Sequence, residues 1–489
     1  MRPKPATEID RRPFSLYLMK GQKRAGRRIM AICVMMKGRF PVDKRMNLLS
    51  LTWPIFIENM LFMLLGFIDI FVLSRYNDVA ASAVSAANQV ISICNLVFSI
   101  ISGATAILIS QSLGAEKRQS ASMIAALSLL FSTLIGLIVS ALIAVFHRPL
   151  LAALGAQGDI LEYGCEYLLI VGGFIFTQAI LNSVTAILRS HGYTRISMYV
   201  TAIMNVLNAI LDTAFVLGLF GLPSLGVRGV AIATTLARVA GVAILCFMLF
   251  SQVESPSIFA LLKPFPREEG KKILLVGLPS AFESINYNVA QLVVTSIIFH
   301  FLSDTDFITK TYFSNIVIFF YVFSNSIAQA AQILVGYHMG NGDPESADRV
   351  CMHSLKVSLL ISMSISIGAL FVRQYLMMIF TTDPVIVQAG ASLFFIDLFV
   401  EFGRTFNIVV INGLRGAGDT VYPSVVAVFS MWIVSTLGCY LLAVPLGLGL
   451  PGIWIAFAAD ECLRGLLMQL RWKSGKWKNK SLYSRAKAS

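Results

Sequence analysis

The chain contains two copies of one sequence pattern, and a nearly constant number of residues separates the copies. The segment Leu188–Thr194 (LRSHGYT) reappears as Leu414–Thr420 (LRGAGDT), at an offset of 226 (414 − 188). Further matches are Pro54 with Pro279 at 225, Ile107 with Ile333 and Gly114 with Gly340 at 226, and Gly229 with Gly452 at 223. A near-constant offset from end to end indicates two homologous halves, so we expect a duplicated structural unit.

The composition places both halves in a membrane. Of the 489 residues, 56% are hydrophobic and 13% are charged, whereas a soluble protein carries roughly 25% charged residues. Ala121–Phe146 contains no charged residue and exceeds the ~20 residues with which a helix crosses a bilayer. Runs of this length and uniformity are typical of helices and not of barrel strands. We therefore expect an all-α polytopic membrane protein.

Six apolar segments can be distinguished in each half. The expected spans are roughly 47–73, 79–112, 119–146, 164–188, 196–217, 227–250, 272–302, 309–337, 345–372, 389–413, 421–444 and 451–470. An even-numbered unit returns to the side of the membrane on which it began, so the repeat is parallel, with its pseudo-twofold axis along the membrane normal. The prediction is two six-helix lobes, 47–250 and 272–470, joined by a proline-containing flexible linker at 251–271. Two such lobes are typical of a transporter whose pathway lies between them.

The formal net charge of +13 is concentrated at the two ends of the chain. Basic residues crowd the arm 1–46 and the tail 471–489, which flank the first and last predicted spans. Under the positive-inside rule these segments lie in the cytoplasm, so we expect both termini there, in a bacterial inner (plasma) membrane whose anionic lipids they contact. This placement argues against nucleic acid as a partner. Translation could also begin within the arm, for example at Met36.

Two aspartates lie inside predicted spans of the first half. Asp69 is deep in the first span, and Asp212 lies in the fifth span, one helical turn after Asn208. Asn205 lies nearby on the same helix. A charge at mid-bilayer costs ~2.5–3.5 kcal/mol on insertion scales and is a functional candidate by default. Carboxylate and amide oxygens together suit a hard cation or a proton; the alternative is that each aspartate hydrogen-bonds to a neighbouring helix.

Glu58 and Glu283 occupy equivalent positions in the first and seventh spans. Each faces either the central cavity or a partner within its own lobe, and the sequence does not separate these possibilities. The turn Leu-Arg-x-x-Gly, present in both halves, is expected on the cytoplasmic side. Its arginine either reaches the membrane surface or ties loops of a lobe together.

Two further charged groups lie in the second half. Asp397, Glu401 and Arg404 follow one another at helical spacing in the tenth span, as a stripe that is either internally neutralised or in contact with substrate. Asp460 and Glu461 with Arg464 in the twelfth span are expected to form an interfacial pair.

The sequence argues against an enzyme. The five histidines and seven cysteines are scattered without the spacing of metal ligands, so no metal centre is expected apart from Na⁺ at Asp69, Asn208 and Asp212. The chain contains no Walker A sequence, nucleophile elbow or acid–base constellation. It also contains no filter-like loop that would indicate a channel.

Several motifs together resemble the multidrug and toxic compound extrusion (MATE) family, over nearly all of 45–470. They are Leu51–Pro54 running to Asp69, the Leu-Arg-x-x-Gly turn, Asn208–Asp212 followed by Gly221–Pro223, and Gly226–Ala231. The resemblance implies two six-helix lobes in a V, alternating access, and export of organic cations and other amphiphiles driven by Na⁺ or H⁺.

The resemblance also implies a site. In one branch of the family, a span-one aspartate, a span-five Asn-x-x-x-Asp and a span-six threonine form a cation site in the first lobe. Four residues of this chain match them: Asp69, Asn208, Asp212 and Thr234. Another branch adds acids in spans seven and ten. Here Glu283 lies early in span seven and Arg404 lies near the expected acid of span ten, so the resemblance does not support an ion site in the second lobe.

The predicted function is secondary active efflux of cationic or amphiphilic organic compounds in exchange for Na⁺ or H⁺, by a monomer without a cofactor. Tyr287 is a candidate for the aromatic lining that suits flat amphiphiles. One alternative is a lipid-linked oligosaccharide flippase of the same superfamily, which would carry several arginines in its cavity; here arginines cluster at span ends, with Arg238 and Arg404 as exceptions. The other is an exporter of one specific metabolite.

Overall fold

A computed structural model describes residues 46–74, 77–218 and 224–483. The basic arm predicted at 1–46 lies outside the described residues except for Met46, as do the last six residues of the predicted tail and the Gly221–Pro223 motif. In the described ranges the regular secondary structure is entirely helical, as the composition predicted.

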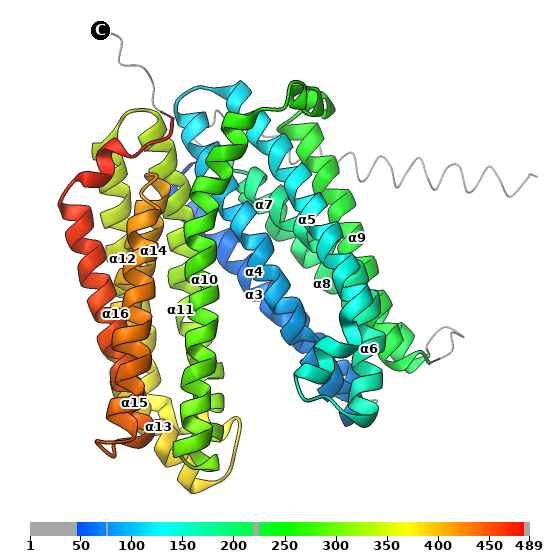
Figure 1. Cartoon of the computed structure of the whole chain (residues 1–489), viewed down its shortest axis with the longest axis vertical. Helices are drawn as coiled ribbons and strands as arrows, with labels where there is room; N and C mark the ends of the chain where they lie inside the picture. Colours follow the sequence, from blue (N-terminus) through cyan, green and yellow to red (C-terminus); the bar gives the residue numbers. More distant parts are fainter. Residues whose placement is uncertain (1–45, 75–76, 219–223, 484–489) are drawn as a thin grey trace, which may run out of the picture. The chain divides into compact units, whose positions relative to one another are not determined.

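The first half folds into seven helices, which we call the N-lobe (Figure 1). They are α3 (Leu48–Ser74), α4 (Asp78–Gly114), α5 (Arg118–Ala153), α6 (Gly158–Gly173), α7 (Phe176–Ser190), α8 (Thr194–Leu217) and α9 (Gly226–Gln252). The second half, the C-lobe, consists of α10 (Arg267–Phe301), α11 (Asp304–Gly340), α12 (Pro344–Met378), α13 (Pro384–Gly416), α14 (Val421–Ser430), the π-helical turn η3 (Met431–Thr436), α15 (Leu437–Ala443) and α16 (Gly449–Lys473). The 3-10 helix η2 (Pro256–Leu262) lies between the lobes in sequence, and η4 (Lys476–Asn479) follows α16.

These helices make twelve membrane-length segments in the described part of the chain. Nine stretches are long and apolar enough to cross a membrane, and α6 with α7, bent by 46°, makes a tenth. The remaining two, α10 and α16, have 35 and 25 residues. Each contains charged side chains, such as Glu283 and Asp460, that pair with other residues inside the C-lobe. The predicted twelve-helix fold is therefore confirmed.

The duplication is visible where the two lobes meet, at the C-terminal ends of α4 and α11. A Cβ atom on Gly114 would lie 1.9 Å from the backbone oxygen of Tyr337, and one on Gly340 would lie 2.0 Å from the backbone oxygen of Gln111. The two glycines are 226 residues apart (340 − 114), and so are the two residues whose backbone they approach (337 − 111), which is the offset of the repeat. Only glycine permits this approach of two backbones, so the pseudo-twofold axis passes between these helices.

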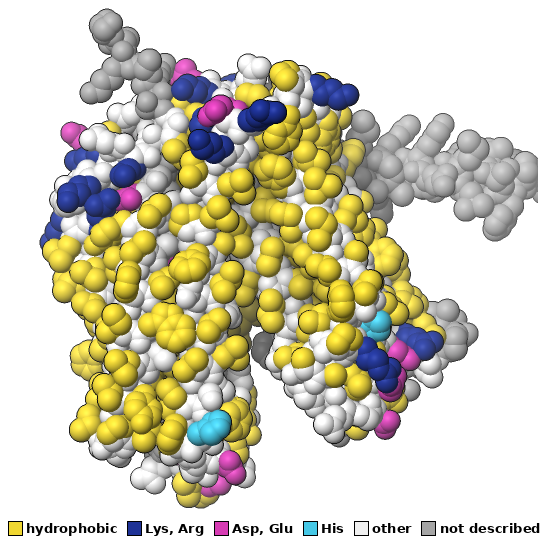
Figure 2. Space-filling model, in the orientation of Figure 1, with side chains coloured by type: hydrophobic (Ala, Val, Ile, Leu, Met, Phe, Trp, Pro, Cys, Tyr) yellow, Lys and Arg dark blue, Asp and Glu magenta, His cyan; other side chains and the backbone are white. Residues whose placement is uncertain are grey.

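The chain's C-terminal segment connects the lobes at the same end. The side chain of Gln111 in the N-lobe donates from Nε2 to the backbone oxygen of Gly416 (2.8 Å) and accepts at Oε1 from the backbone nitrogen of Leu482 (2.9 Å). The buried ring of Tyr483 lies 4.1 Å from Nζ of Lys272. At the opposite end, Figure 2 shows an open recess between the lobes. Lysine and arginine side chains gather at the closed end in the same view.

The segment between the lobes is packed against the N-lobe, which differs from the flexible connector that its prolines suggest. η2 lies against α5, with Ile258 buried. Oγ of Ser122 on α5 donates to the carboxylate of Glu254 at 2.8 Å. The connector therefore holds the start of α5 and the end of α9 together.

Candidate functional site

Helices α3, α6, α8 and α9 bring five polar side chains to one buried place in the N-lobe. We call Asp69, Tyr167, Asn208, Asp212 and Thr234 the acid cluster; all five are buried. Oδ2 of Asp69 accepts hydrogen bonds from Thr234 Oγ1 (3.3 Å) and from the Tyr167 hydroxyl (3.4 Å). Thr234 Oγ1 in turn accepts one from Nδ2 of Asn208 (3.3 Å). The structure thus brings together the four residues that the sequence predicted as the coupling site.

Most oxygen atoms of the acid cluster have no hydrogen-bond donor. Oδ1 of Asp69, both carboxylate oxygens of Asp212 and Oδ1 of Asn208 are buried without a partner in the described part of the chain, and so is Oδ1 of the adjacent Asn205. The carboxylates of Asp69 and Asp212 interact electrostatically with each other. Buried oxygens without donors are unfavourable. They are the kind of group that a bound proton or cation stabilises.

Two members of this environment were missed by the sequence analysis. Tyr167 comes from α6, and its hydroxyl also lies 3.5 Å from Oδ1 of Asn88. No spacing in the sequence connects it with Asp69. Arg238 lies one turn after Thr234 on α9 and is buried, with Nε and Nη1 unpartnered among the described residues. A mid-span arginine four residues from a site threonine was the signal available for it.

Glu58 and Glu283 form the same ion pair, once in each lobe. Nη2 of Arg189 lies 2.8 Å from Oε2 of Glu58, and Nη2 of Arg415 lies 2.6 Å from Oε2 of Glu283. Both arginines come from the Leu-Arg-x-x-Gly turn. The turn therefore ties α7 to α3 and α13 to α10, within its own lobe.

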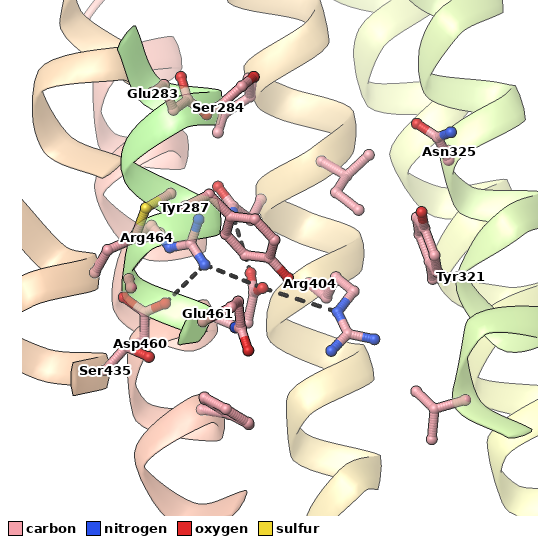
Figure 3. A pocket seen from close by; sticks show the side chains of 18 of the residues that line it. Glu283, Ser284, Tyr287, Tyr321, Asn325, Arg404, Ser435, Asp460, Glu461 and Arg464 are labelled. Atoms are coloured by element: carbon pink, nitrogen blue, oxygen red, sulfur yellow. Dashed lines mark hydrogen bonds and ion pairs between the residues drawn. The ribbon is translucent and has the colours of Figure 1, made fainter. Parts of the chain in front are cut away.

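The C-lobe contains a dense network of buried charges between α13 and α16 (Figure 3). Arg404 pairs with Glu401 and reaches Oε1 of Glu461 at 3.8 Å. Arg464 lies 2.7 Å from Asp460 and 3.0 Å from Glu461. The two groups that the sequence placed on separate helices, the Asp397–Arg404 stripe and the Asp460–Arg464 pair, thus form one network through Glu461. Asp397 stands apart and accepts a hydrogen bond from Nε1 of Trp454 (3.3 Å).

A cavity of about 550 Å³ adjoins this network and opens beside α4 of the N-lobe. Glu283, Tyr287, Asp397 and Arg404, four of the predicted contacts, line it. Glu58, Asn205 and Glu401 do not. In Figure 3 the Tyr287 ring lies next to the arginines, across from Tyr321 and Asn325. The cavity has the size of a small-molecule site.

The duplicated unit matches a known protein family. The family model MatE matches residues 54–214 and 279–441, one segment in each half. The chain belongs to the MatE family. The starts and ends of the two matched segments differ by 225 (279 − 54) and 227 (441 − 214) residues, so the family unit is itself the repeat.

Two relatives extend the match over most of the chain. The uncharacterized transporter YisQ of Bacillus subtilis is 37% identical over 442 residues, covering 90% of this chain and 97% of the relative. A probable multidrug resistance protein NorM of Thermotoga maritima is 29% identical over 441 residues, covering 90% of this chain and 95% of the relative. The resemblance to the MATE family seen in the sequence is thereby confirmed.

Solved structures of MATE proteins share the fold. A crystal structure of MATE in the bent conformation superposes with a TM-score of 0.82 at 21% identity, over 91% of this chain and 98% of the other. An outward-facing MATE transporter superposes with a TM-score of 0.79 at 21% identity, over 88% of this chain and 96% of the other. At this identity the likeness concerns the fold, and the site must be argued from this chain's own residues.

Proposed function

We propose that this MATE protein is a secondary active antiporter that exports cationic and amphiphilic organic compounds in exchange for Na⁺ or H⁺. The observation that carries the proposal is the acid cluster, with its buried carboxylate oxygens that lack donors. A relative carries the name of a probable multidrug resistance protein, which supports organic compounds as the exported class.

The coupling follows from the charge of the acid cluster. When both aspartates are ionised, the N-lobe presents negative charge that stabilises a cationic compound in the recess between the lobes. A proton or Na⁺ bound at Asp69 and Asp212 removes that charge and lowers the affinity for the compound. Such coupling requires that ion and compound bind the two states of the transporter differently.

The movement follows from the duplicated contact. The lobes are joined at the end where Gly114 and Gly340 approach the opposite backbone, and they are separated at the other end (Figure 2). Alternating access requires this contact to open while the recess closes. The Arg189–Glu58 and Arg415–Glu283 pairs hold each lobe together while it moves.

The orientation and assembly are part of the proposal. The basic end, at which the lobes meet, would face the cytoplasm under the positive-inside rule, which makes this an outward-open state in a bacterial plasma membrane with both termini inside. Each subunit contains both lobes, so a monomer suffices.

The charge of the C-lobe cavity argues against the flippase alternative. A flippase for anionic lipid-linked sugars would need basic side chains that are free to bind phosphate. The three cavity arginines, Arg404, Arg415 and Arg464, are all paired with acids. The lysine in the lining, Lys310, donates a hydrogen bond to Thr295.

The test is dye efflux from proteoliposomes, with Na⁺ and pH gradients imposed separately. We expect one of the gradients to drive efflux by the wild type, and Asp69→Asn to lose that acceleration while still exchanging dye without a gradient. Asp69→Glu, which keeps the carboxylate, is the control for folding and charge. Undiminished gradient-driven efflux by Asp69→Asn would contradict the coupling role.

A further inference from the structure

The acid cluster has a permanent positive charge beside it. Arg238 lies on α9 one turn from Thr234, whose hydroxyl donates to Asp69. Its side chain is 8% exposed, and its Nε and Nη1 atoms have no hydrogen-bond partner in the described ranges. A guanidinium is always charged in a protein. A charge buried without hydrogen bonds is unfavourable unless opposite charge lies near it.

The opposite charge comes from the acid cluster. The helices packed against α9 include α3, α6 and α8, which carry the ionisable groups of the acid cluster: Asp69, the phenol of Tyr167 and Asp212. Arg238 interacts electrostatically with Asp69 and with Tyr167. It forms no direct ion pair with an aspartate in the described residues, so both carboxylates keep free oxygens.

The count of charges leads to the inference, which rests on the ion coupling proposed above. With both aspartates ionised, Asp69, Asp212 and Arg238 sum to −1 (−1 − 1 + 1). We propose that Arg238 is a resident counterion of the acid cluster, and that it limits the cluster to one exchanged positive charge in each transport cycle. One proton or one Na⁺ makes the site neutral. A second would leave a net positive charge in a buried place, which Arg238 opposes.

The inference makes Arg238 a residue that sets stoichiometry without touching the exported compound. Replacing it with glutamine leaves a cluster of charge −2 that accepts two cations. Arg238→Lys keeps the charge and should keep one. In the double variant Arg238→Gln/Asp212→Asn the cluster returns to −1, although the residues differ from the wild type.

The experiment measures how steep a dye gradient a given ion gradient can sustain in proteoliposomes, with the membrane potential clamped at zero. For a tenfold gradient of the coupling ion, one exchanged ion supports a dye gradient of roughly tenfold and two support roughly 100-fold, since equal free energies balance. We expect roughly tenfold for the wild type and Arg238→Lys, and roughly 100-fold for Arg238→Gln. The same limiting gradient for Arg238→Gln as for the wild type would overturn the inference.

If the variants do not transport dye, thermal unfolding of the purified proteins still tests the role of Arg238. We expect Arg238→Gln to have a lower Tm than the wild type, and the added Asp212→Asn change to restore it. If the double variant is no more stable than Arg238→Gln, Arg238 is not a counterion of the cluster. A wild type that exports no dye in either gradient would instead contradict the proposed function, and leaves the stability comparison to decide the role of Arg238.

Discussion

The two lobes are related by the repeat but handle buried charge in different ways. In the N-lobe, Asp212 has no donor for either carboxylate oxygen and Arg238 has unpaired nitrogens. In the C-lobe, Arg404 and Arg464 are each bound to two acids. A buried charge held in an ion pair is already compensated, whereas an uncompensated buried charge is stabilised by binding an ion. On this ground we propose that ion exchange takes place in the N-lobe and that the charge network of the C-lobe serves structural cohesion.

The repeat makes this difference sharper at a single position. The counterpart of Asp69 at an offset of 226 is Thr295 (69 + 226). Its hydroxyl accepts a hydrogen bond from Nζ of Lys310 at 2.8 Å. Where the N-lobe has a carboxylate, the C-lobe thus has a hydroxyl beside an ammonium group. The two lobes thus share their Glu–Arg pairs but differ in charge at this position.

The largest loss of transport is expected from substitutions of the two equivalent glycines at the contact between the lobes. Gly114→Leu and Gly340→Leu should each lower transport by roughly tenfold or more, because a side chain would overlap the opposite backbone and overpacking costs about 1–3 kcal/mol. Gly368→Leu on α12, where nothing lies within 4 Å of an added Cβ, is the matched control. Efflux rates of the three variants measure this, and a clear difference between Gly114→Leu and Gly340→Leu would contradict the symmetric contact.

The next largest effect, a loss of stability, is expected from a substitution in the charge network of the C-lobe. Arg464→Met leaves Asp460 and Glu461 without their guanidinium, and loss of one partner in a buried pair costs about 3–5 kcal/mol of unfolding free energy. Arg228→Met, which removes an exposed pair with Glu166, should cost far less, because an exposed ion pair contributes little to stability. Unfolding in detergent compares the two. Equal losses of unfolding free energy in the two variants would mean that the charge network does not stabilise the C-lobe.

A smaller effect is expected from the duplicated ion pair. Glu58→Gln should reduce the unfolding free energy by about 1–3 kcal/mol, as for a hydrogen bond to a charged group. Glu283→Gln should reduce it less, because Glu283 and Arg415 are partly exposed to the cavity, whereas Glu58 is fully buried. The same unfolding measurement applies to both. A larger loss for Glu283→Gln would reverse this ranking.

The smallest effect on stability is expected in the N-lobe. Asp212→Asn removes a charge whose oxygens have no donors, so its unfolding free energy should stay within about 1 kcal/mol of the wild type or rise. The measurement is made at neutral pH without Na⁺, where no ion stabilises the aspartate. A loss as large as that of Arg464→Met would show that Asp212 is a structural partner.

Much of the fold could be predicted from the sequence, because hydropathy and the repeat offset are properties of the chain alone. The twelve segments and the two lobes followed from them. The break between α6 and α7 at Gly173 could not be found, since the predicted span 164–188 remains apolar across it. The bend depends on how these helices pack on α5 and α9.

The site was predictable where residues share a helix or a family motif, as Asn208 and Asp212 do. Tyr167 was missed because its approach to Asp69 depends on the packing of α6 against other helices. The connection of Arg404 to Glu461 was missed for the same reason, since α13 and α16 lie far apart in the sequence. The sequence left open whether Glu58 pairs with a residue of its own lobe, as it does with Arg189. The repeat shows which positions are equivalent, but not which residues are in contact.

The most direct test of the N-lobe as the site of ion exchange compares one neutralised aspartate in each lobe. Asp212→Asn and Asp397→Asn are assayed for dye efflux in the same proteoliposomes, with and without the gradient that drives the wild type. The account predicts that Asp212→Asn loses the acceleration by the gradient and that Asp397→Asn keeps it, even where its affinity for the dye changes. The reverse result, with coupling lost in Asp397→Asn and kept in Asp212→Asn, would contradict it.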